Sequence, residues 1–94
     1  MNKSFNESPS KDYIVYILRC ADNSLYCGIT NDLKKRIKNH NAGKASKCTR
    51  ARLPVELVYF EEGFDKSSAL KREIEIKKLS HEKKLNLIKE NRAI

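Results

Sequence analysis

The sequence predicts an α+β domain, a small three-stranded antiparallel sheet flanked by helices in the order β-β-α-β-α-α. Two runs of β-branched and aromatic residues lie close together with turn residues between them, and a third run follows a basic stretch. Segments with helical periodicity follow the second and third runs. A sheet this small needs helices packed against it to complete a core, and 94 residues are enough for one such core.

The first two strands are predicted at residues 13–20 (YIVYILRC) and 25–29 (LYCGI). Asp-Asn-Ser between them is turn chemistry, so the two strands form a hairpin. Gly28 inside a strand requires a bulge or the close approach of another group. The third strand is predicted at residues 55–61 (VELVYFE). It must pair with one edge of the hairpin, and the sequence alone leaves both edges open.

A helix is predicted directly after the hairpin. One of the polar residues 30–32 caps it, and it reaches about Asn41, where Gly43 ends it. Residues 44–53 are then expected to form a basic loop or an irregular turn that leads to the third strand.

Two more helices are predicted after the third strand. Gly63 and Asp65 mark a break and a cap before a helix at residues 67–79. Ser80 caps a final helix over about residues 81–91. No internal repeat is visible, so these elements belong to one domain.

The N-terminal residues 1–11 are polar and contain no apolar signal core, so we expect a flexible tail before a domain at residues 12–94, and no export. No apolar run is long enough to span a membrane, and no membrane association is expected. Three cysteines without a Cys-x-x-Cys pair argue against a disulfide framework or a zinc site. Cys20 and Cys27 are expected to be small apolar fillers. These features fit a cytoplasmic protein.

The chain is strongly basic, with 20 Lys+Arg against 12 Asp+Glu and a net charge of +8. Such a charge suits a polyanionic partner, although a solvated surface would explain the net value equally well. The distribution favours the polyanion, because eight basic residues and no acid lie between Leu33 and Val55. They are Lys34, Lys35, Arg36, Lys38, Lys44, Lys47, Arg50 and Arg52.

Two polar residues of the first helix lie on or beside its apolar stripe. With Leu33 at 0°, a helix places Ile37 at about 40°, His40 at about −20° and Arg36 at about −60°. A histidine satisfied by a neighbour and a solvated arginine would explain this pattern, as would a functional pair.

Glu73 lies inside the apolar arc of the next helix. With Ala69 at 0°, Ile76 lies at about −20° and Glu73 at about 40°. A carboxylate is rarely buried alone, so Glu73 must pair with a cation, bind a metal or be protonated. Lys77, at about 80°, is the candidate for a structural salt bridge, and both explanations stay open at this point.

Three tyrosines crowd the predicted hairpin, Tyr13, Tyr16 and Tyr26. Cross-strand aromatic packing would account for them. A phenol can also orient or accept a proton when a metal or a cation lies near it.

Together, these residue types are the parts that phosphodiester cleavage requires. Water must lose a proton, the non-bridging oxygens need positive charge, and the leaving 3′ oxygen needs a Lewis acid or a proton. One carboxylate that holds one hydrated Mg²⁺ can assist the leaving group. An arginine can bind the scissile phosphate through two parallel hydrogen bonds.

Four segments, in order, resemble the GIY-YIG nuclease domain. Residues 14–16 (IVY) correspond to the first of the family's name-giving triplets and residues 26–28 (YCG) to the second. Residues 28–40 resemble the family's G-x-T-x-D-L-x-x-R-x-x-x-H stretch, and residues 69–79 resemble its metal-glutamate helix. The resemblance covers about residues 13–87 and is closest to the short stand-alone GIY-YIG proteins of bacteria.

The resemblance implies an endonuclease that hydrolyses a phosphodiester in nucleic acid with a divalent metal, Mg²⁺ or Mn²⁺, in DNA repair or nucleic-acid processing. DNA is favoured over RNA as the substrate. Relatives often carry a separate targeting domain, for which this chain has no room. Targeting would then come from a protein partner, or the enzyme would cut with little selectivity, and the oligomeric state is left open.

The resemblance also implies the roles of the site residues. Tyr16 and Tyr26 are its active-site phenols, one of which activates or orients the attacking water. Arg36 binds the phosphate, His40 assists beside the phosphate or the water, and Glu73 holds the metal. The nucleic-acid-binding side chains are expected in the basic stretch: Lys35, Lys44, Lys47, Arg50 and Arg52.

Gly28 is expected to keep the passage from strand to helix open beside the site. For Tyr16 and Tyr26 to share that site, both must project from one face of the hairpin, so the numbers of opposed residues must sum to an even value. A loop flanked by the pair Cys20 and Leu25 would break this rule. An odd-length turn or a bulge is therefore predicted.

Two other hypotheses are weighed against the endonuclease. A non-catalytic DNA- or RNA-binding module needs only the basic stretch at residues 34–52 and tolerates loss of Glu73. A structural domain would pair Glu73 with Lys77 or Arg36. The endonuclease is favoured because the phenols, the arginine and the glutamate occur together.

Overall fold

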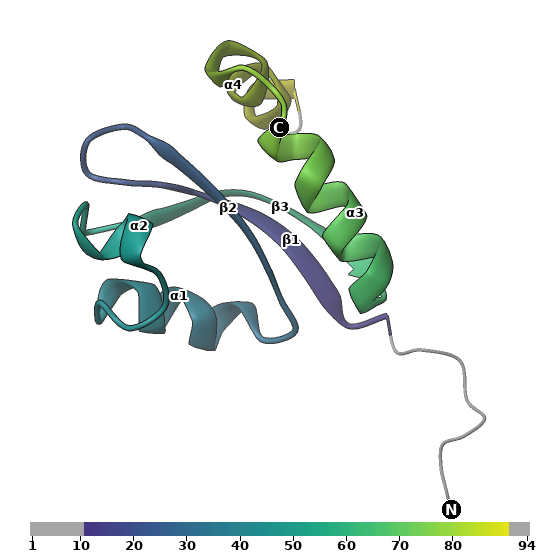
Figure 1. Cartoon of the computed structure of the whole chain (residues 1–94), viewed down its shortest axis with the longest axis horizontal. Coiled ribbons are helices and arrows are strands. Elements are labelled where there is room, and N and C mark those ends of the chain that lie inside the picture. The colour runs from purple at the N-terminus through teal and green to yellow at the C-terminus, as the bar shows by residue number, and fades with distance from the viewer. Residues whose placement is uncertain (1–10, 91–94) are drawn as a thin grey trace, which may run out of the picture.

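The fold is a single antiparallel sheet with helices on both faces, as the sequence predicts (Figure 1). The structure, a computed structural model, describes residues 11–90. Its elements are β1 (Tyr13–Arg19), β2 (Leu25–Thr30), α1 (Leu33–Asn41), α2 (Lys47–Arg50), β3 (Glu56–Phe64), α3 (Lys66–Lys77) and α4 (His81–Glu90). The strand order is β2-β1-β3, so β3 pairs with β1 and β2 remains at an edge.

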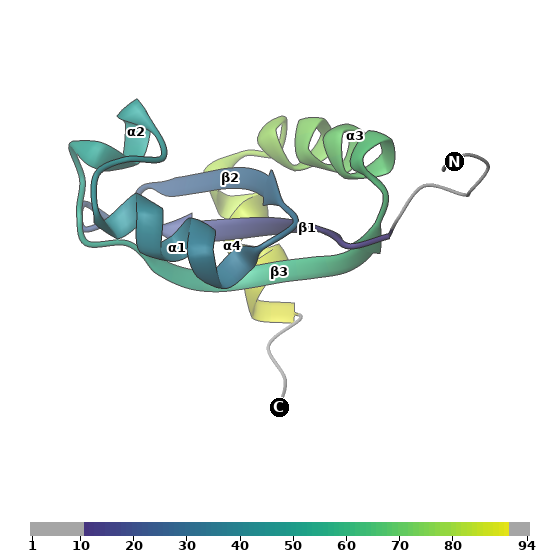
Figure 2. The same ribbon diagram turned by 90° about the horizontal axis from the view of Figure 1, so that it is seen from below.

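One face of the sheet packs against α3 and α4. Val15 and Ile17 of β1 point to this face, because alternate residues of a strand share a side. They form a buried cluster with Ala69 and Ile76 of α3, and partly buried side chains of α4 complete it. Figure 2 shows α3 along one side of β2 with α1 on the other side.

The opposite face packs against α1. Here Tyr16 and Leu18 of β1 are buried together, and Tyr26 of β2 joins them. Leu33 and Ile37, the apolar stripe of α1, cover this cluster. His40 belongs to the same stripe and is 1% exposed, so its predicted position on the apolar side of the helix is confirmed.

The hairpin has the register that the shared-site hypothesis requires. Tyr16 lies opposite Gly28 and Leu18 lies opposite Tyr26, so the numbers of opposed residues sum to an even value. The connection at residues 20–24 has an odd length, which confirms the prediction. Asn23, whose φ of 69° is in the left-handed region, closes this turn.

The turn between β2 and α1 is fixed by two short side chains. The hydroxyl of Thr30 accepts a hydrogen bond from the Asp32 amide at 3.0 Å. The Asp32 carboxylate in turn accepts from the Lys35 amide at 3.2 Å, so Asp32 is the cap among the three candidates. The cap sets where the helix starts and therefore which side chains of α1 face the sheet.

The end of α1 is attached to the start of β3. The Asn41 side chain accepts a hydrogen bond from the Val55 amide at 2.8 Å and donates to the Val55 carbonyl at 3.2 Å. The helix ends at Asn41 and Gly43 follows with a φ of 76°, as predicted. His40 therefore lies in a helical turn that is held at its end.

Two boundaries differ from the sequence prediction. Residues 47–50, expected to be a loop, form one helical turn that Ser46 caps. The third strand does not end at Glu61 but continues through Gly63 to Phe64, which lies opposite Tyr13. Gly63 has a φ of 90°, a conformation that glycine adopts without strain, so the strand twists there instead of ending.

The helices after β3 begin close to their predicted caps. Asp65 caps α3 by accepting from the Ser68 amide, although α3 starts at Lys66 and ends at Lys77. The Ser80 hydroxyl accepts from the Lys83 amide at the start of α4. Residues 1–10 of the tail predicted at 1–11, and the predicted end of the last helix at 91, lie outside the described residues.

The cysteines behave as predicted. Cys20 and Cys27 are buried, unbridged and packed among apolar side chains, and Cys48 is unbridged and exposed. Within residues 11–90, no helix combines the length and the apolar character needed to cross a bilayer.

Candidate active site

The Tyr16 ring lies directly over Gly28, its cross-strand neighbour. A Cβ atom on Gly28 would be 2.7 Å from the Tyr16 hydroxyl oxygen and 2.8 Å from Cζ. It would also be 3.1 Å from Cε2 of Tyr26. Only a residue without a side chain fits beneath the two phenol rings, which is the physical reason for a glycine inside this strand.

A buried chain of hydrogen bonds starts at Tyr16. Its hydroxyl oxygen is 2.9 Å from His40 Nε2, and His40 Nδ1 is 2.8 Å from Thr49 Oγ1. The Thr49 hydroxyl donates to the Ser46 carbonyl at 3.4 Å. Tyr16, His40 and Thr49 are at most 1% exposed, so the chain is closed to solvent.

One assignment of protons satisfies every polar atom in this chain. Because the Thr49 hydroxyl donates to a carbonyl, its oxygen is free to accept from His40 Nδ1–H. His40 Nε2 then carries no proton and accepts from the Tyr16 hydroxyl. Tyr16 is therefore a hydrogen-bond donor and His40 is a neutral imidazole.

The electrostatics of the site agree with that assignment. Burial raises the pKa of Tyr16 well above its usual range, Tyr26 adds to the shift, and the charge of Arg36 opposes it. Burial and then the Arg36 charge lower the pKa of His40. Both groups are consequently neutral at pH 7, and Tyr16 is unsuited to act as a base.

Tyr26 is the more accessible of the two phenols. It is half-buried, its ring centroid is 6.3 Å from that of Tyr16, and it lies edge-on to the His40 ring at 5.1 Å. Tyr13, the third tyrosine of the hairpin, packs against the α3 side of the sheet. The structure thus brings two of the three phenols together.

Arg36 lies one helical turn before His40 on α1 and is half-buried. Its charge lowers the pKa of both Tyr16 and His40, so the guanidinium lies within electrostatic reach of these two side chains. An open hollow of about 280 Å³ adjoins it. The hollow is lined by Thr30, Asn31, Asp32, Lys35, Arg36 and Asn39.

A larger hollow, of about 490 Å³, lies at the other end of the hairpin, between α4 and the sheet. Arg19, Leu25 and Ile88 are among its lining residues, and no predicted site residue is. Its walls combine apolar side chains with Arg19, which is already paired with Glu56, so it is a less suitable place for a phosphate than the hollow beside Arg36.

Glu73 comes from α3, which packs on the face opposite α1. Its side chain is 16% exposed, and its Oε2 lies 3.2 Å from Lys77 Nζ, the partner that a structural salt bridge requires. Burial and the Glu73 charge raise the pKa of Cys27 to about 11, and the same charge contributes to the shift of Tyr16. The carboxylate therefore lies close to β2, the edge strand between α1 and α3 (Figure 2).

Glu73 fits a divalent cation that is held by a single carboxylate. Among the described residues no three His, Cys, Asp or Glu side chains form a metal-binding cluster. Mg²⁺ does not need one, because it usually keeps several waters and binds one or two carboxylates together with substrate phosphates. Lys77 is 54% exposed and flexible, so it can move away from the carboxylate.

The predicted nucleic-acid-binding residues divide into two groups. All five are exposed, and four of them form no ion pair with another described residue: Lys35, Lys44, Lys47 and Arg50. Arg52 instead donates to the Asp22 carboxylate at 2.9 Å and to the Cys48 carbonyl at 2.6 Å. Arg52 connects α2 to the β1–β2 turn, so its guanidinium is engaged by other residues of the chain and is less available to a nucleic acid.

Comparison with known proteins agrees with this geometry. The sequence pattern described as the GIY-YIG catalytic domain matches residues 12–86. The chain belongs to the GIY-YIG family. The family is one of phosphodiester-cleaving nucleases that act on nucleic acid and generally use divalent metals.

The chain is also similar to UPF0213 proteins. It is 51% identical to one from Staphylococcus haemolyticus, over 83% of this chain and 95% of that protein. It is 49% identical to one from Haloquadratum walsbyi, over 87% and 92%. The NMR structure of a UPF0213 protein from Bacillus halodurans matches with a TM-score of 0.55 and 43% identity, over 84% of each chain.

Thr49 is the residue of this GIY-YIG site that sequence reasoning missed. It lies in the segment expected to be irregular, where only the lysines and arginines stood out. Ser46 followed by Thr49 at the spacing of one helical turn was the available signal, and that pattern is too common to single out a residue.

We predict that Gly28→Ala destabilises the GIY-YIG fold by about 1–3 kcal/mol in urea unfolding, because the new methyl group displaces the Tyr16 ring. The His40 ring signals should shift in NMR spectra at the same time. Gly63→Ala is the control: its Cβ would meet no atom within 4 Å, so it should cost only the strain of a positive φ and leave those signals unchanged. Wild-type stability of Gly28→Ala would contradict the packing described.

We also predict a specific pH dependence. The unfolded chain protonates its histidines near pH 6.5, whereas the pKa of folded His40 is lower. The His40 contribution is thus fully present above about pH 6.5 and is lost as pH falls toward the folded pKa, by at most about 1.4 kcal/mol per pH unit. His40→Gln should flatten this part of the stability profile. His81→Gln, at an exposed position on α4, should not, and equal slopes for the two variants would refute the prediction.

Proposed function

We propose that this chain is an endonuclease that hydrolyses a phosphodiester bond in nucleic acid with one divalent metal. The convergence of three elements at the β2 edge carries the proposal. β2 provides Tyr26, α1 provides Arg36, and α3 provides Glu73 from the other side of the sheet. Membership of a nuclease family supports it independently.

In this proposal the two phenols have different tasks. Tyr16 is buried, neutral and bonded to His40, so it holds the histidine and supports the Tyr26 ring. Tyr26 is at the accessible end of the aromatic cluster and orients the attacking water. His40, with its second nitrogen bonded to Thr49, positions both rings.

Arg36 binds the scissile phosphate in this proposal. A guanidinium can donate two parallel hydrogen bonds to phosphate oxygens and stabilise the charge that they gain as the water attacks. The open hollow beside Arg36 leaves space for that group. Within residues 11–90, Arg36 forms no ion pair with a carboxylate, whereas Arg52 and Arg72 both do.

Glu73 is the proposed metal-binding residue. A hydrated Mg²⁺ or Mn²⁺ would stabilise negative charge on the leaving 3′ oxygen when bound. In the absence of that cation, the half-buried carboxylate is paired with Lys77, which a bound cation would replace.

The substrate is proposed to lie along the exposed basic side chains of residues 34–50, with DNA favoured over RNA and with a role in repair or processing in the cytoplasm. Lys35, Lys44, Lys47 and Arg50 would release counterions on binding, so log affinity should fall linearly with log salt. Selectivity would come from a protein partner, or the enzyme would cut with little preference.

A second candidate is favoured by one observation, the 3.2 Å contact of Glu73 with Lys77. If that ion pair is the whole role of Glu73, the chain is a non-catalytic module that binds nucleic acid through its basic residues. Such a module would bind every substrate and cut none.

The proposed function predicts that cutting requires both metal and Glu73. Labelled single-stranded, duplex and branched DNA, and RNA, would be incubated with the protein in Mg²⁺, Mn²⁺ or EDTA. Glu73→Gln should lower kcat on the order of 100-fold or more, because it removes the ligand charge while keeping the shape. Its affinity for the same substrate, measured in EDTA, should remain close to that of the wild type.

Glu75→Gln is the matched control, since Glu75 is on the same helix with a side chain 66% exposed. It should cut at the wild-type rate. Metal-independent cutting, or wild-type activity of Glu73→Gln, would refute the proposal. Binding of all substrates without cutting would favour the non-catalytic module.

A further inference from the structure

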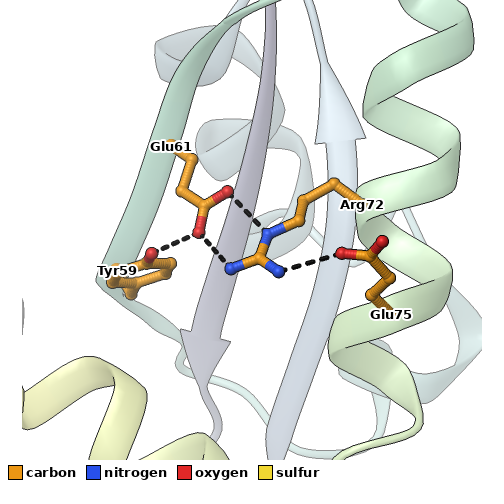
Figure 3. Close-up of polar contacts among 4 residues, drawn as sticks. All are labelled: Tyr59, Glu61, Arg72 and Glu75. Atoms are coloured by element: carbon orange, nitrogen blue, oxygen red, sulfur yellow. Dashed lines mark hydrogen bonds and ion pairs between the residues drawn. The ribbon is translucent and has the colours of Figure 1, made fainter.

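A polar cluster joins α3 to β3 on the side away from the candidate active site (Figure 3). Arg72 Nε and Nη2 donate to the two carboxylate oxygens of Glu61, each at 2.8 Å. Arg72 Nη1 donates to Glu75 at 3.0 Å, and the Tyr59 hydroxyl donates to Glu61. The paired bonds between Arg72 and Glu61 fix both the distance and the angle between helix and strand.

This pair is better shielded from water than the surface pairs of the chain. The Arg72 and Glu61 side chains are 32% and 21% exposed, compared with 47% and 62% for Arg19 and Glu56. Hydrogen bonds from Arg72 hold the pKa of Glu61 below its usual range. Burial and the bond to Glu61 raise the pKa of Tyr59 to about 12, so Tyr59 stays protonated and continues to donate.

The positions of Arg72 and Glu73 around α3 are geometrically linked. Ala69 and Ile76 are fully buried and mark the side of the helix that faces the sheet. Relative to that side, Arg72 lies about 50° in one direction and Glu73 about 50° in the other. When Arg72 reaches β3, Glu73 is therefore directed toward β2, and a rotation of the helix would move both.

Apolar packing alone does not select this orientation. Leu70 and Ile74 of α3 are 41% and 53% exposed, on the same side of the helix as Glu73. A rotation of α3 about its axis would bury the Leu70 and Ile74 side chains, which is favourable. The same rotation would move Glu73 from the β2 edge to the space between the helix and the sheet. That rotation would expose Ala69 and Ile76, which now face the sheet, so one large side chain and one methyl group oppose the burial of two large side chains.

We propose that the Arg72–Glu61 pair is a positioning device that holds α3 in its less apolar orientation, so that Glu73 is presented at the β2 edge. Tyr59 supports the pair by occupying a further lone pair of Glu61. Arg72 thus acts through Glu73. The functional part of this inference rests on the proposed function, because the role of Glu73 at the metal is itself proposed.

The orientation of α3 can be measured without activity. A soluble gadolinium chelate broadens NMR signals of exposed methyl groups, so the Leu70 and Ile74 methyls of the wild type should be strongly affected. Arg72→Lys keeps the charge but cannot form the paired bonds. Its Leu70 and Ile74 methyls should be several-fold better protected. Glu61→Gln removes the charge of the carboxylate and keeps its shape, so it should protect the same two methyl groups. This variant replaces Arg72→Lys in the experiment if Arg72→Lys does not fold.

A rescue experiment separates positioning from simple stabilisation. Leu70→Gln with Ile74→Gln removes the reason for α3 to rotate, so adding both changes to Arg72→Lys should restore activity. Arg72→Lys by itself should lower kcat about 10- to 100-fold with KM unchanged, since small displacements of a catalytic group have effects of that size. A merely structural pair would lower Tm and would not be rescued by two more polar residues.

Glu75→Gln is the control, because it removes the charge of one Arg72 partner and leaves the paired bonds to Glu61 intact. It should retain the wild-type methyl exposure and kcat. Wild-type exposure of the Leu70 and Ile74 methyls in both Arg72→Lys and Glu61→Gln would overturn the inference. If those methyls become protected while Glu73→Gln cuts like the wild type, the orientation of α3 by Arg72 stands and the proposed role of Glu73 fails.

Discussion

The packing of the Tyr16 ring over Gly28 is the contact on which the candidate site depends. It requires an even cross-strand register, an odd-length turn and a residue without a side chain at position 28. Once the ring lies there, its hydroxyl reaches His40 on α1, and His40 reaches Thr49 on α2. One contact within the hairpin is thereby linked to both α1 and α2.

The strand order explains why the site forms at β2. Because β3 occupies the other side of β1, β2 is the edge strand at which α1, from one face, and α3, from the opposite face, approach each other. The aromatic and cationic groups come from the α1 face, and the carboxylate comes from α3. Glu73 and Arg36 thus come from opposite faces, and the ion pair of Glu73 is with Lys77 and not with Arg36, one alternative suggested by the sequence.

The chain accepts unfavourable local arrangements at this site. A half-buried glutamate has a flexible lysine as its ion-pair partner, and two large apolar side chains of α3 stay exposed beside it. Both features are costly for folding alone. They are understandable if α3 must present a carboxylate at the sheet edge, and the partly buried hydrogen bonds between Arg72 and Glu61 then provide the orientation that apolar packing does not.

Much of the fold could be predicted from local patterns. The strands of the hairpin and the cap Asp65 follow from side-chain chemistry, and Asp32 was one of three candidate caps. The odd turn was predicted only from the hypothesis that Tyr16 and Tyr26 share a site. The edge to which β3 adds could not be predicted, because it depends on contacts between elements distant in sequence. The continuation of β3 through Gly63 was missed because glycine usually marks a break, whereas here Phe64 has a place opposite Tyr13.

The residues of the candidate site could be named from the sequence, but their contacts with one another could be predicted only in part. The anomalous positions of His40 and Glu73 were visible from helical periodicity, since a polar residue on an apolar stripe needs a partner. Thr49 and the structural contacts of Arg52 were not visible, because each partner is brought close only by the folded chain. The sequence also could not assign different roles to Tyr16 and Tyr26, because the two tyrosines differ only in how deeply they are buried.

The most direct test of this account is a long-range ¹H–¹⁵N NMR spectrum of the His40 ring at pH 7, assigned with a His40→Gln variant. The account predicts a neutral imidazole with its proton on Nδ1 and an unprotonated Nε2 that accepts from Tyr16. A proton on Nε2, or on both nitrogens, would contradict it. Tyr16 would then no longer be the donor in the buried chain, and the division of roles between the two phenols would fail.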